Sequence, residues 1–214
     1  MDFKYIFFDL DGTLTDPGPG ITNSVMYALD KFGIHDKREN LYRFIGPPLV
    51  DSFIEFYGFS EEDSRKAVGY YREYFADKGL YENRVYDGIP QVLEKLLKSG
   101  LHLLVATSKP AYFANKILSH FCIDGFFDYV SGADLDGNKN AKSDIIKEAL
   151  EVSRAPLEQV LMIGDRRHDI EGAKANNVMS AGVLYGYGDR PELEAAGADF
   201  IIETVEDILR FAIG

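Results

Sequence analysis

Short apolar runs alternate with longer amphipathic segments along most of this chain, and this alternation limits the folds open to it. Short runs rich in β-branched and aromatic residues are typical of buried strands, whereas the segments between them have apolar residues at helical spacing. Strands separated by helices form a parallel sheet with helices on its faces. The sequence therefore predicts an α/β fold, with strands at residues 5–9, 102–106, 129–131, 160–163, 179–184 and 200–202.

Helices are predicted between most of these strands. In residues 89–97, apolar residues three or four positions apart fall on one face, and Gly100 stands where glycine favours the end of a helix. The same spacing recurs at residues 145–150 and 205–209. We expect these helices to cover the sheet.

One long stretch, from about residue 18 to residue 84, breaks the alternation because it contains helical spacing and no predicted strand. Segments rich in Gly, Pro, Asn and Asp flank it at residues 16–20 and 83–88, which is typical of hinges. Its helices are predicted at residues 21–32, at 49–57 and from Val68 onward. We therefore predict an inserted all-helical subdomain of residues 17–83 and a core of residues 1–16 and 84–214.

The charge balance limits the partners. The chain carries 23 Lys and Arg residues against 35 Asp and Glu residues, a net charge of −12. Nucleic acid polymers and anionic membrane surfaces bind through basic side chains, so neither partner is expected. No apolar run approaches the ~20 residues of a membrane span, and acidic residues interrupt the first apolar run, so no signal peptide is expected. These observations predict a cytoplasmic monomer or homodimer that acts on a small molecule.

The single cysteine, Cys122, lies in an apolar stretch. One cysteine excludes an intramolecular disulfide. We expect a buried structural thiol at this position rather than a reactive one.

Two carboxylates follow the first predicted strand. Residues 8–14 read Phe-Asp-Leu-Asp-Gly-Thr-Leu, so Asp9 and Asp11 project in the same general direction. Ligands of parallel sheets bind at the C-terminal ends of the strands, and Gly12 permits a bend that brings backbone N–H groups close to an anion. The segment predicts a Mg²⁺-assisted phosphate site; the alternative is a strand that simply ends in an Asp-Gly turn.

Residues 9–14 resemble the first motif of phosphatases of the haloacid dehalogenase superfamily. The resemblance implies a Rossmann-like parallel sheet core and covalent catalysis, in which Asp9 attacks phosphorus and becomes an aspartyl-phosphate. It implies that Asp11 protonates the leaving oxygen and later deprotonates the attacking water. The carboxylate of Asp9 and the backbone carbonyl of Asp11 would bind Mg²⁺.

The second motif of the family is a Thr or Ser at the end of a later strand. Thr107 follows the predicted strand of residues 102–106. The resemblance implies that the Thr107 hydroxyl binds a phosphate oxygen, with the N–H of Ser108 close by.

The third motif is a lysine ahead of the fourth motif, and Lys139 and Lys142 both qualify by position. We prefer Lys142 because it directly precedes a predicted helix, although Ser143 stands where many relatives have proline. A lysine here would offset the repulsion between Asp9 and the incoming phosphate.

The fourth motif is the run from Val160 to Asp169, in which an apolar strand is followed by Gly-Asp and by a second Asp four residues later. The resemblance implies that Asp165 binds the metal directly, and that Asp169 either binds it through water or orients the lysine. His168 is predicted to have no ligand role, because Mg²⁺ prefers oxygen.

The helical insertion resembles the cap of one branch of the superfamily. A cap excludes water and contacts the leaving group of the substrate. Gly46 opens a Gly-Pro-Pro loop that faces the active site in relatives, so it is a candidate substrate contact. Arg43 would bind a substrate carboxylate or phosphate, or else is an exposed arginine at a helix end. The sequence leaves the role of Lys78 open.

The cap is similar to those of phosphoglycolate phosphatase-like and 5′-nucleotidase-like members. The predicted function is therefore hydrolysis of a small, phosphoglycolate-like phosphate monoester with Mg²⁺ as cofactor. A 5′-nucleotidase, a sugar-phosphate phosphatase and a phosphomutase are alternatives. Dehalogenases and phosphonatases lack the second Asp, so Asp11 argues against both reactions.

A receiver domain, a phosphate-accepting signalling module, is the alternative without enzymatic activity. It too combines acidic residues and Mg²⁺ with a Thr or Ser and a Lys-Pro pair, which Thr107 and Lys109-Pro110 match in part. Its phosphorylated Asp ends the third strand, whereas the acidic pair of this chain follows the first. The order of the motifs therefore disfavours a receiver.

Overall fold

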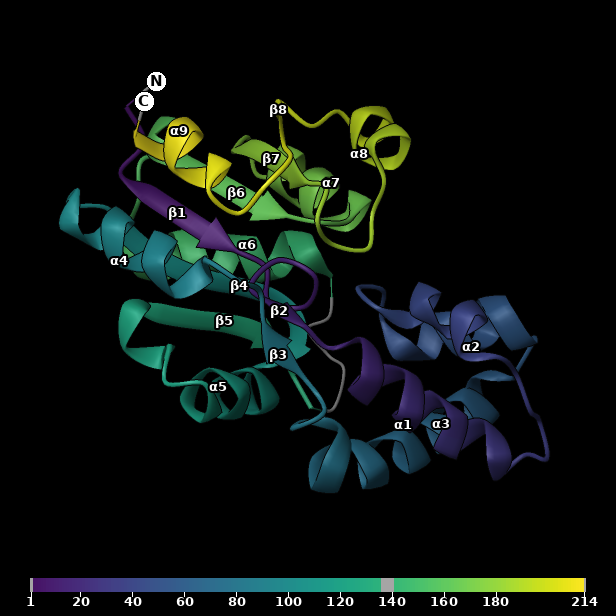
Figure 1. Ribbon diagram of the computed structural model, residues 1–214. Helices are drawn as coiled ribbons and strands as arrows, with labels where there is room; N and C mark the ends of the chain where they lie inside the picture. The colour runs from purple at the N-terminus through teal and green to yellow at the C-terminus, as the bar shows by residue number, and fades with distance from the viewer. Residues whose placement is uncertain (1, 136–140, 214) are drawn as a thin grey trace. The chain divides into compact units, whose positions relative to one another are not determined.

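The computed structural model describes residues 2–135 and 141–213 (Figure 1). Contacts between Cα atoms divide the chain into two compact units. The first contains the sheet and comprises Met1–Asp16 and Val85–Gly214, and the second comprises Pro17–Arg84.

A parallel sheet forms the centre of the first unit, which confirms the predicted α/β fold. The strand order is β5-β4-β1-β6-β7-β8, and each pair of neighbours is parallel. β1 therefore lies inside the sheet, between β4 and β6. The strands are β1 (Tyr5–Phe8), β4 (His102–Pro110), β5 (Tyr129–Ala133), β6 (Val160–Gly164), β7 (Met179–Val183) and β8 (Phe200–Ile202).

Helices cover both faces of the sheet. α6 (Lys142–Ser153) contacts β4 and β5, and its neighbour α7 (Arg167–Ala175) contacts β6 and β7. On the opposite face, α4 (Ile89–Lys98) packs beside α9 (Asp207–Ile213), as Figure 1 shows. The other elements are α5 (Ala111–His120), η3 (Asp124–Phe126), η4 (Leu157–Gln159) and α8 (Arg190–Ala196). Over the described parts of the chain, no helix is long and apolar enough for a membrane span.

Both faces of the sheet are hydrophobic, as expected for parallel strands covered on two sides. Toward α6, Phe7 belongs to a buried cluster with Leu104, Met162 and Ile146. Successive side chains of a strand point to opposite faces, and Phe8 is also fully buried.

The strand register brings the C-terminal ends of three strands to one edge of the sheet. Phe8 pairs with Val105 on one side and with Ile163 on the other. The N–H of Asp9 continues this pattern by donating to the carbonyl oxygen of Ile163 at 2.9 Å. The residues that follow β1, β4 and β6 therefore emerge next to one another.

The second unit is built from helices, and the helices predicted for this stretch are confirmed. α3 begins before the predicted apolar stripe because the Ser60 hydroxyl accepts a hydrogen bond from the N–H of Asp63 at 3.0 Å, an N-cap. Phe44 and Phe53 are buried edge to face, with centroids 5.0 Å apart. The elements are α1 (Gly18–Asp30), η1 (Arg38–Phe44), α2 (Leu49–Tyr57), α3 (Glu61–Tyr74) and the π-helical turn η2 (Phe75–Gly79).

Two short strands were not predicted. β2 (Thr15–Asp16) and β3 (Arg84–Val85) form a separate two-stranded sheet where the chain leaves and rejoins the first unit. Each is too short to show an alternating apolar pattern.

The prediction of a buried thiol at Cys122 is wrong, because this side chain is exposed. α5 ends at His120, and Cys122 has a left-handed backbone conformation with φ of 56°. The chain turns at this residue, and the next one, Ile123, occupies the buried position.

Candidate active site

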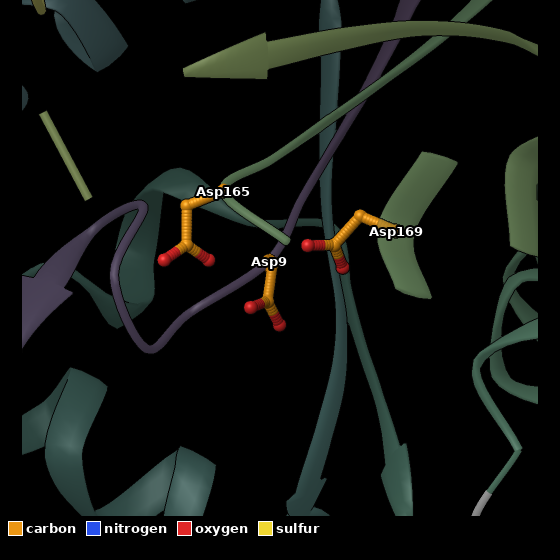
Figure 2. Close-up of side chains that lie close together, drawn as sticks. All are labelled: Asp9, Asp165 and Asp169. Carbon is orange, nitrogen blue, oxygen red and sulfur yellow. The ribbon is translucent and has the colours of Figure 1, made fainter. Parts of the chain in front are cut away.

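Three aspartates lie together at the C-terminal edge of the sheet (Figure 2). Asp9 follows β1, Asp165 follows β6, and Asp169 lies in the first turn of α7. Each offers one carboxylate oxygen, and these oxygens all lie within 4.8 Å of one another. All three residues are buried. Carboxylates this close repel one another unless positive charge lies among them.

Two glycines permit the close approach of these aspartates. Gly12 has a φ of +87°, and a Cβ at this position would lie 2.0 Å from Oδ2 of Asp165. At Gly164, a Cβ would lie 2.2 Å from Cγ of Asp169. Any larger residue at either position would displace a carboxylate, so the two Gly residues of the motifs shape the cluster.

Lys142 supplies positive charge from the start of α6. Its Nζ lies 2.8 Å from Oδ1 of Asp9 and 2.8 Å from Oδ1 of Asp169, and it donates to the carbonyl oxygen of Ala106 at 3.0 Å. Burial alone would lower the pKa of Lys142, but the carboxylates of Asp169 and Asp9 raise it above its usual range. Asp169 thus holds the lysine, one of the two roles that the sequence left open. Lys139 lies outside the described residues.

A second buried lysine, which sequence reasoning missed, contacts Asp11. The Nζ of Lys109 lies 2.7 Å from Oδ2 of Asp11, and both residues are buried. Burial raises the pKa of Asp11, and Lys109 offsets only part of this shift. The available signal was the Lys-Pro pair behind Thr107, which also occurs in receiver domains.

Thr107 lies at the end of the regular part of β4. The pairing of β4 with β5 shifts between Thr107 and Pro110, and the N–H of Lys109 donates to the Thr107 hydroxyl at 3.2 Å. Thr107 is buried and Ser108 is half-buried. Gly132 of β5 allows this path, because a Cβ there would lie 2.7 Å from the carbonyl oxygen of Lys109.

Asp165 has the features of a cation ligand. Its Oδ2 accepts a hydrogen bond from the N–H of Tyr187 at 2.8 Å, whereas its Oδ1 is buried and has no hydrogen-bond partner among the described residues. Burial raises the pKa of Asp165 well above its ordinary value, and the charges of Asp169 and Asp9 raise it further. Burial is also the main cause that raises the pKa of Asp169 to about 6. Three clustered carboxylates, with the buried Oδ1 of Asp165 lacking a partner among the described residues, fit a hard divalent cation such as Mg²⁺.

The chain matches the family model of the haloacid dehalogenase-like hydrolases over residues 6–183. It belongs to this family. The match confirms the resemblance inferred from the motifs, and its range contains every core residue predicted for the site.

Several relatives of this hydrolase are named as phosphatases. A 5′-nucleotidase of Pseudomonas aeruginosa is 50% identical over 196 residues, which cover 91% of this chain and 89% of that protein. A phosphoglycolate phosphatase of Vibrio parahaemolyticus is 28% identical and covers 98% of this chain and 96% of that protein. The crystal structure of a predicted phosphatase from Clostridium acetobutylicum has a TM-score of 0.96 and 46% identity, over 99% of this chain and 98% of that one. The hydrolase is therefore a phosphoric monoester hydrolase.

The candidate substrate contacts of the cap lie in the second unit of the hydrolase. The guanidinium of Arg43 is exposed and lies 4.3 Å from the centroid of the Phe56 ring, a contact that stabilises the helical unit. Gly46 is half-buried with φ of 102°, and Nζ of Lys78 lies 5.8 Å from the centroid of the Tyr74 ring. Roles of Arg43, Gly46 and Lys78 toward a substrate stay predictions.

His168 is not among the clustered residues Asp9, Asp165 and Asp169, and its lack of a ligand role stays a prediction. Burial lowers its pKa, and the neighbouring Arg167 and Arg166 lower it further. A neutral imidazole is therefore expected at the start of α7.

Proposed function

We propose that the protein is a Mg²⁺-dependent phosphatase that transfers the phosphoryl group of a small phosphate monoester to Asp9. The observation that carries the proposal is the contact of Asp9 with Lys142, next to the unpaired carboxylate oxygen of Asp165. A lysine on the attacking carboxylate offsets its repulsion from the phosphoryl oxygens. The contact also fixes the direction of the Asp9 side chain.

In the proposed reaction, an oxygen of Asp9 attacks phosphorus while the bond between phosphorus and the leaving oxygen breaks. Asp11 gives its proton to the leaving oxygen and then takes a proton from the water that attacks the aspartyl-phosphate. This second step releases inorganic phosphate and restores Asp9. Burial raises the pKa of Asp11, which favours the protonated form that the first step needs.

The remaining phosphate contacts come from the end of β4 and the turn after β1. The Thr107 hydroxyl and the N–H of Ser108 would bind phosphoryl oxygens, and the N–H groups around Gly12 would lie close to the same anion. These groups are short and fixed to strand ends, so they orient the phosphoryl group with little loss of entropy.

Mg²⁺ would be held by the carboxylates of Asp9 and Asp165 and by the backbone carbonyl of Asp11. Asp169 supports the set by holding Lys142. A bound Mg²⁺ supplies stabilisation of the negative charge that develops on the phosphoryl oxygens.

Of the substrate classes predicted from the sequence, two match the names of relatives, and we infer that a nucleoside monophosphate is preferred. The 5′-nucleotidase of Pseudomonas aeruginosa shares 50% of its aligned residues with this chain. The phosphoglycolate phosphatase of Vibrio parahaemolyticus shares 28%. Phosphoglycolate is therefore the second candidate.

Substitution of the nucleophile tests the chemistry. Asp9→Asn should abolish Mg²⁺-dependent hydrolysis of p-nitrophenyl phosphate, because an amide oxygen is too weak a nucleophile. The exposed Asp124→Asn is the matched control and should keep wild-type activity. Turnover of the Asp9→Asn protein within tenfold of wild type would show that Asp9 is not the nucleophile.

A panel of phosphate esters tests the substrate. The specificity constant kcat/KM is measured for nucleoside monophosphates, phosphoglycolate and sugar phosphates with the same enzyme preparation. We expect a nucleoside monophosphate to rank first. If kcat/KM for phosphoglycolate exceeds that for every nucleoside monophosphate by more than tenfold, phosphoglycolate is the preferred substrate and the inference of a nucleoside monophosphate is wrong.

A further inference from the structure

A short segment after β7, Tyr185–Gly188, packs against the site from outside the family's four motifs. The N–H of Tyr187 donates to Oδ2 of Asp165 at 2.8 Å. This backbone donor is the hydrogen-bond partner of that carboxylate, while Oδ1 of Asp165 has none within the described ranges.

The two glycines of the segment, Gly186 and Gly188, lie so close to Asp165 that neither position has room for a side chain. A Cβ at Gly186 would lie 2.4 Å from Cβ of Asp165 and 2.4 Å from the carbonyl oxygen of Gly12. A Cβ at Gly188 would lie 2.0 Å from the carbonyl oxygen of Asp165. Distances below 3.0 Å leave no room for a side chain, so the segment closes directly around this aspartate.

The tyrosines of the segment bind the chain after β1, one at the turn and one at β2. The Tyr185 hydroxyl donates to the carbonyl oxygen of Thr13 at 3.1 Å, and the Tyr187 hydroxyl donates to Oδ1 of Asp16. The segment is thereby fixed at both hydroxyls, which holds the Tyr187 N–H in place.

We propose that Tyr185–Gly188 is a positioning element for the Mg²⁺ ligand Asp165. The Tyr187 N–H occupies Oδ2 and leaves Oδ1 as the oxygen for the cation. This inference rests on the proposed function, since it assumes that Asp165 binds Mg²⁺. Partners that hold a metal ligand through its other atoms typically contribute 10–100-fold to metal affinity.

The test removes the donor and leaves the side chain in place. Tyr187 is replaced by its α-hydroxy analogue, which changes the amide N–H to an ester oxygen. Mg²⁺ binding is then measured by calorimetry without substrate, with Mn²⁺ binding followed by electron paramagnetic resonance as a second readout. We expect the Kd for Mg²⁺ to rise roughly tenfold or more. An unchanged or lower Kd would overturn the positioning role.

Gly186→Ala provides a second variant, with Gly125→Ala as its control, because a Cβ at Gly125 meets no atom within 4 Å. We expect a weaker Mg²⁺ affinity for Gly186→Ala alone, in protein whose circular dichroism matches wild type. Asp165→Asn separates the two proposals. If it leaves the Kd unchanged, the proposed metal site is wrong; if it raises the Kd while the Tyr187 ester does not, only the positioning role is wrong.

Discussion

Each of the two buried lysines of the site contacts a different aspartate of the proposed reaction. Lys142 contacts Asp9, the proposed nucleophile, and Lys109 contacts Asp11, the proposed acid and base. Lys142, the lysine on Asp9, would assist attack on phosphorus by offsetting the repulsion between the carboxylate and the phosphoryl oxygens. The lysine on Asp11 fixes the side chain that exchanges a proton with the leaving oxygen, so its removal should affect departure of the leaving group.

Lys109→Met should lower kcat for an alkyl phosphate by roughly 100-fold, a size typical of lost acid–base catalysis. The loss for p-nitrophenyl phosphate should be smaller, because p-nitrophenolate leaves without a proton. Steady-state kinetics on both substrates give the ratio, and Lys95→Met, at an exposed lysine of α4, is the control. Equal losses on both substrates, or a change in KM alone, would indicate that Lys109 binds the phosphoryl group instead.

The sequence was sufficient for some site residues and not for others. Asp9 and Asp165 follow strands that the apolar runs identify, and their Gly neighbours mark the turns, so both were predicted. Lys109 was missed because its side chain reaches Asp11 only through the irregular end of β4. Tyr187 was missed because it contributes a backbone N–H, which leaves no signal in residue type.

At the scale of elements, the strands of the sheet were predictable because each contains a short, mostly apolar run between segments of helical spacing. The end of β4 was not, since the strand continues from Ala106 to Pro110 through polar residues. β2 and β3 consist of two residues each and carry no apolar pattern. Long-range contacts define these segments, and local sequence does not report such contacts.

Gly132→Ala should reduce catalysis and leave metal binding intact. A Cβ at Gly132 would lie 2.7 Å from both the carbonyl oxygen of Lys109 and the N–H nitrogen of Ala111, so the end of β4 must move. A displacement of about 1 Å in a catalytic group can lower kcat by up to 100-fold. We expect a loss of at least tenfold in kcat, while the Kd for Mg²⁺ stays within twofold.

Gly125→Ala, on the neighbouring η3, serves as the control for Gly132→Ala, because its added methyl group meets no atom within 4 Å. Calorimetry with Mg²⁺ measures the effect on the aspartate cluster, and kcat measures the effect on the end of β4, which carries Thr107. A parallel loss of kcat and Mg²⁺ affinity in Gly132→Ala would show that the end of β4 also positions the metal ligands, contrary to this prediction.

At the scale of the whole molecule, negative charge is concentrated in two ways. The whole chain is acidic, with a net charge of −12, and part of that negative charge is gathered in three buried carboxylates. The one positive charge of Lys142 contacts two of them and does not neutralise all three. The helical unit was predictable because a long stretch without strands interrupts the α/β pattern. The repulsion among the buried carboxylates of Asp9, Asp165 and Asp169 was not predictable, because it depends on burial and on distances between residues far apart in the sequence.

Because the buried carboxylates repel one another, we predict that the metal-free protein becomes more stable when Asp165 loses its charge. The pKa values of Asp165 and Asp169 are raised in the folded protein, for Asp169 from 3.8 to about 6. Such groups bind protons more tightly when folded than when unfolded, so the free energy of unfolding falls as pH rises from about 4. The penalty of Asp169 is complete above about pH 6. Without metal, Asp165→Asn should therefore have a higher Tm than wild type at pH 7.5, and the difference should shrink toward pH 5.

Mg²⁺ should reverse this order, because a cation that binds only the folded state stabilises it. At 100 times its Kd, Mg²⁺ should add about 2.7 kcal/mol to the free energy of unfolding of wild type and far less to that of Asp165→Asn. Thermal unfolding with and without Mg²⁺ measures both effects, and Asp124→Asn controls for the change in net charge. A metal-free Asp165→Asn protein that is less stable than wild type at pH 7.5 would mean that the carboxylates of the cluster do not oppose folding.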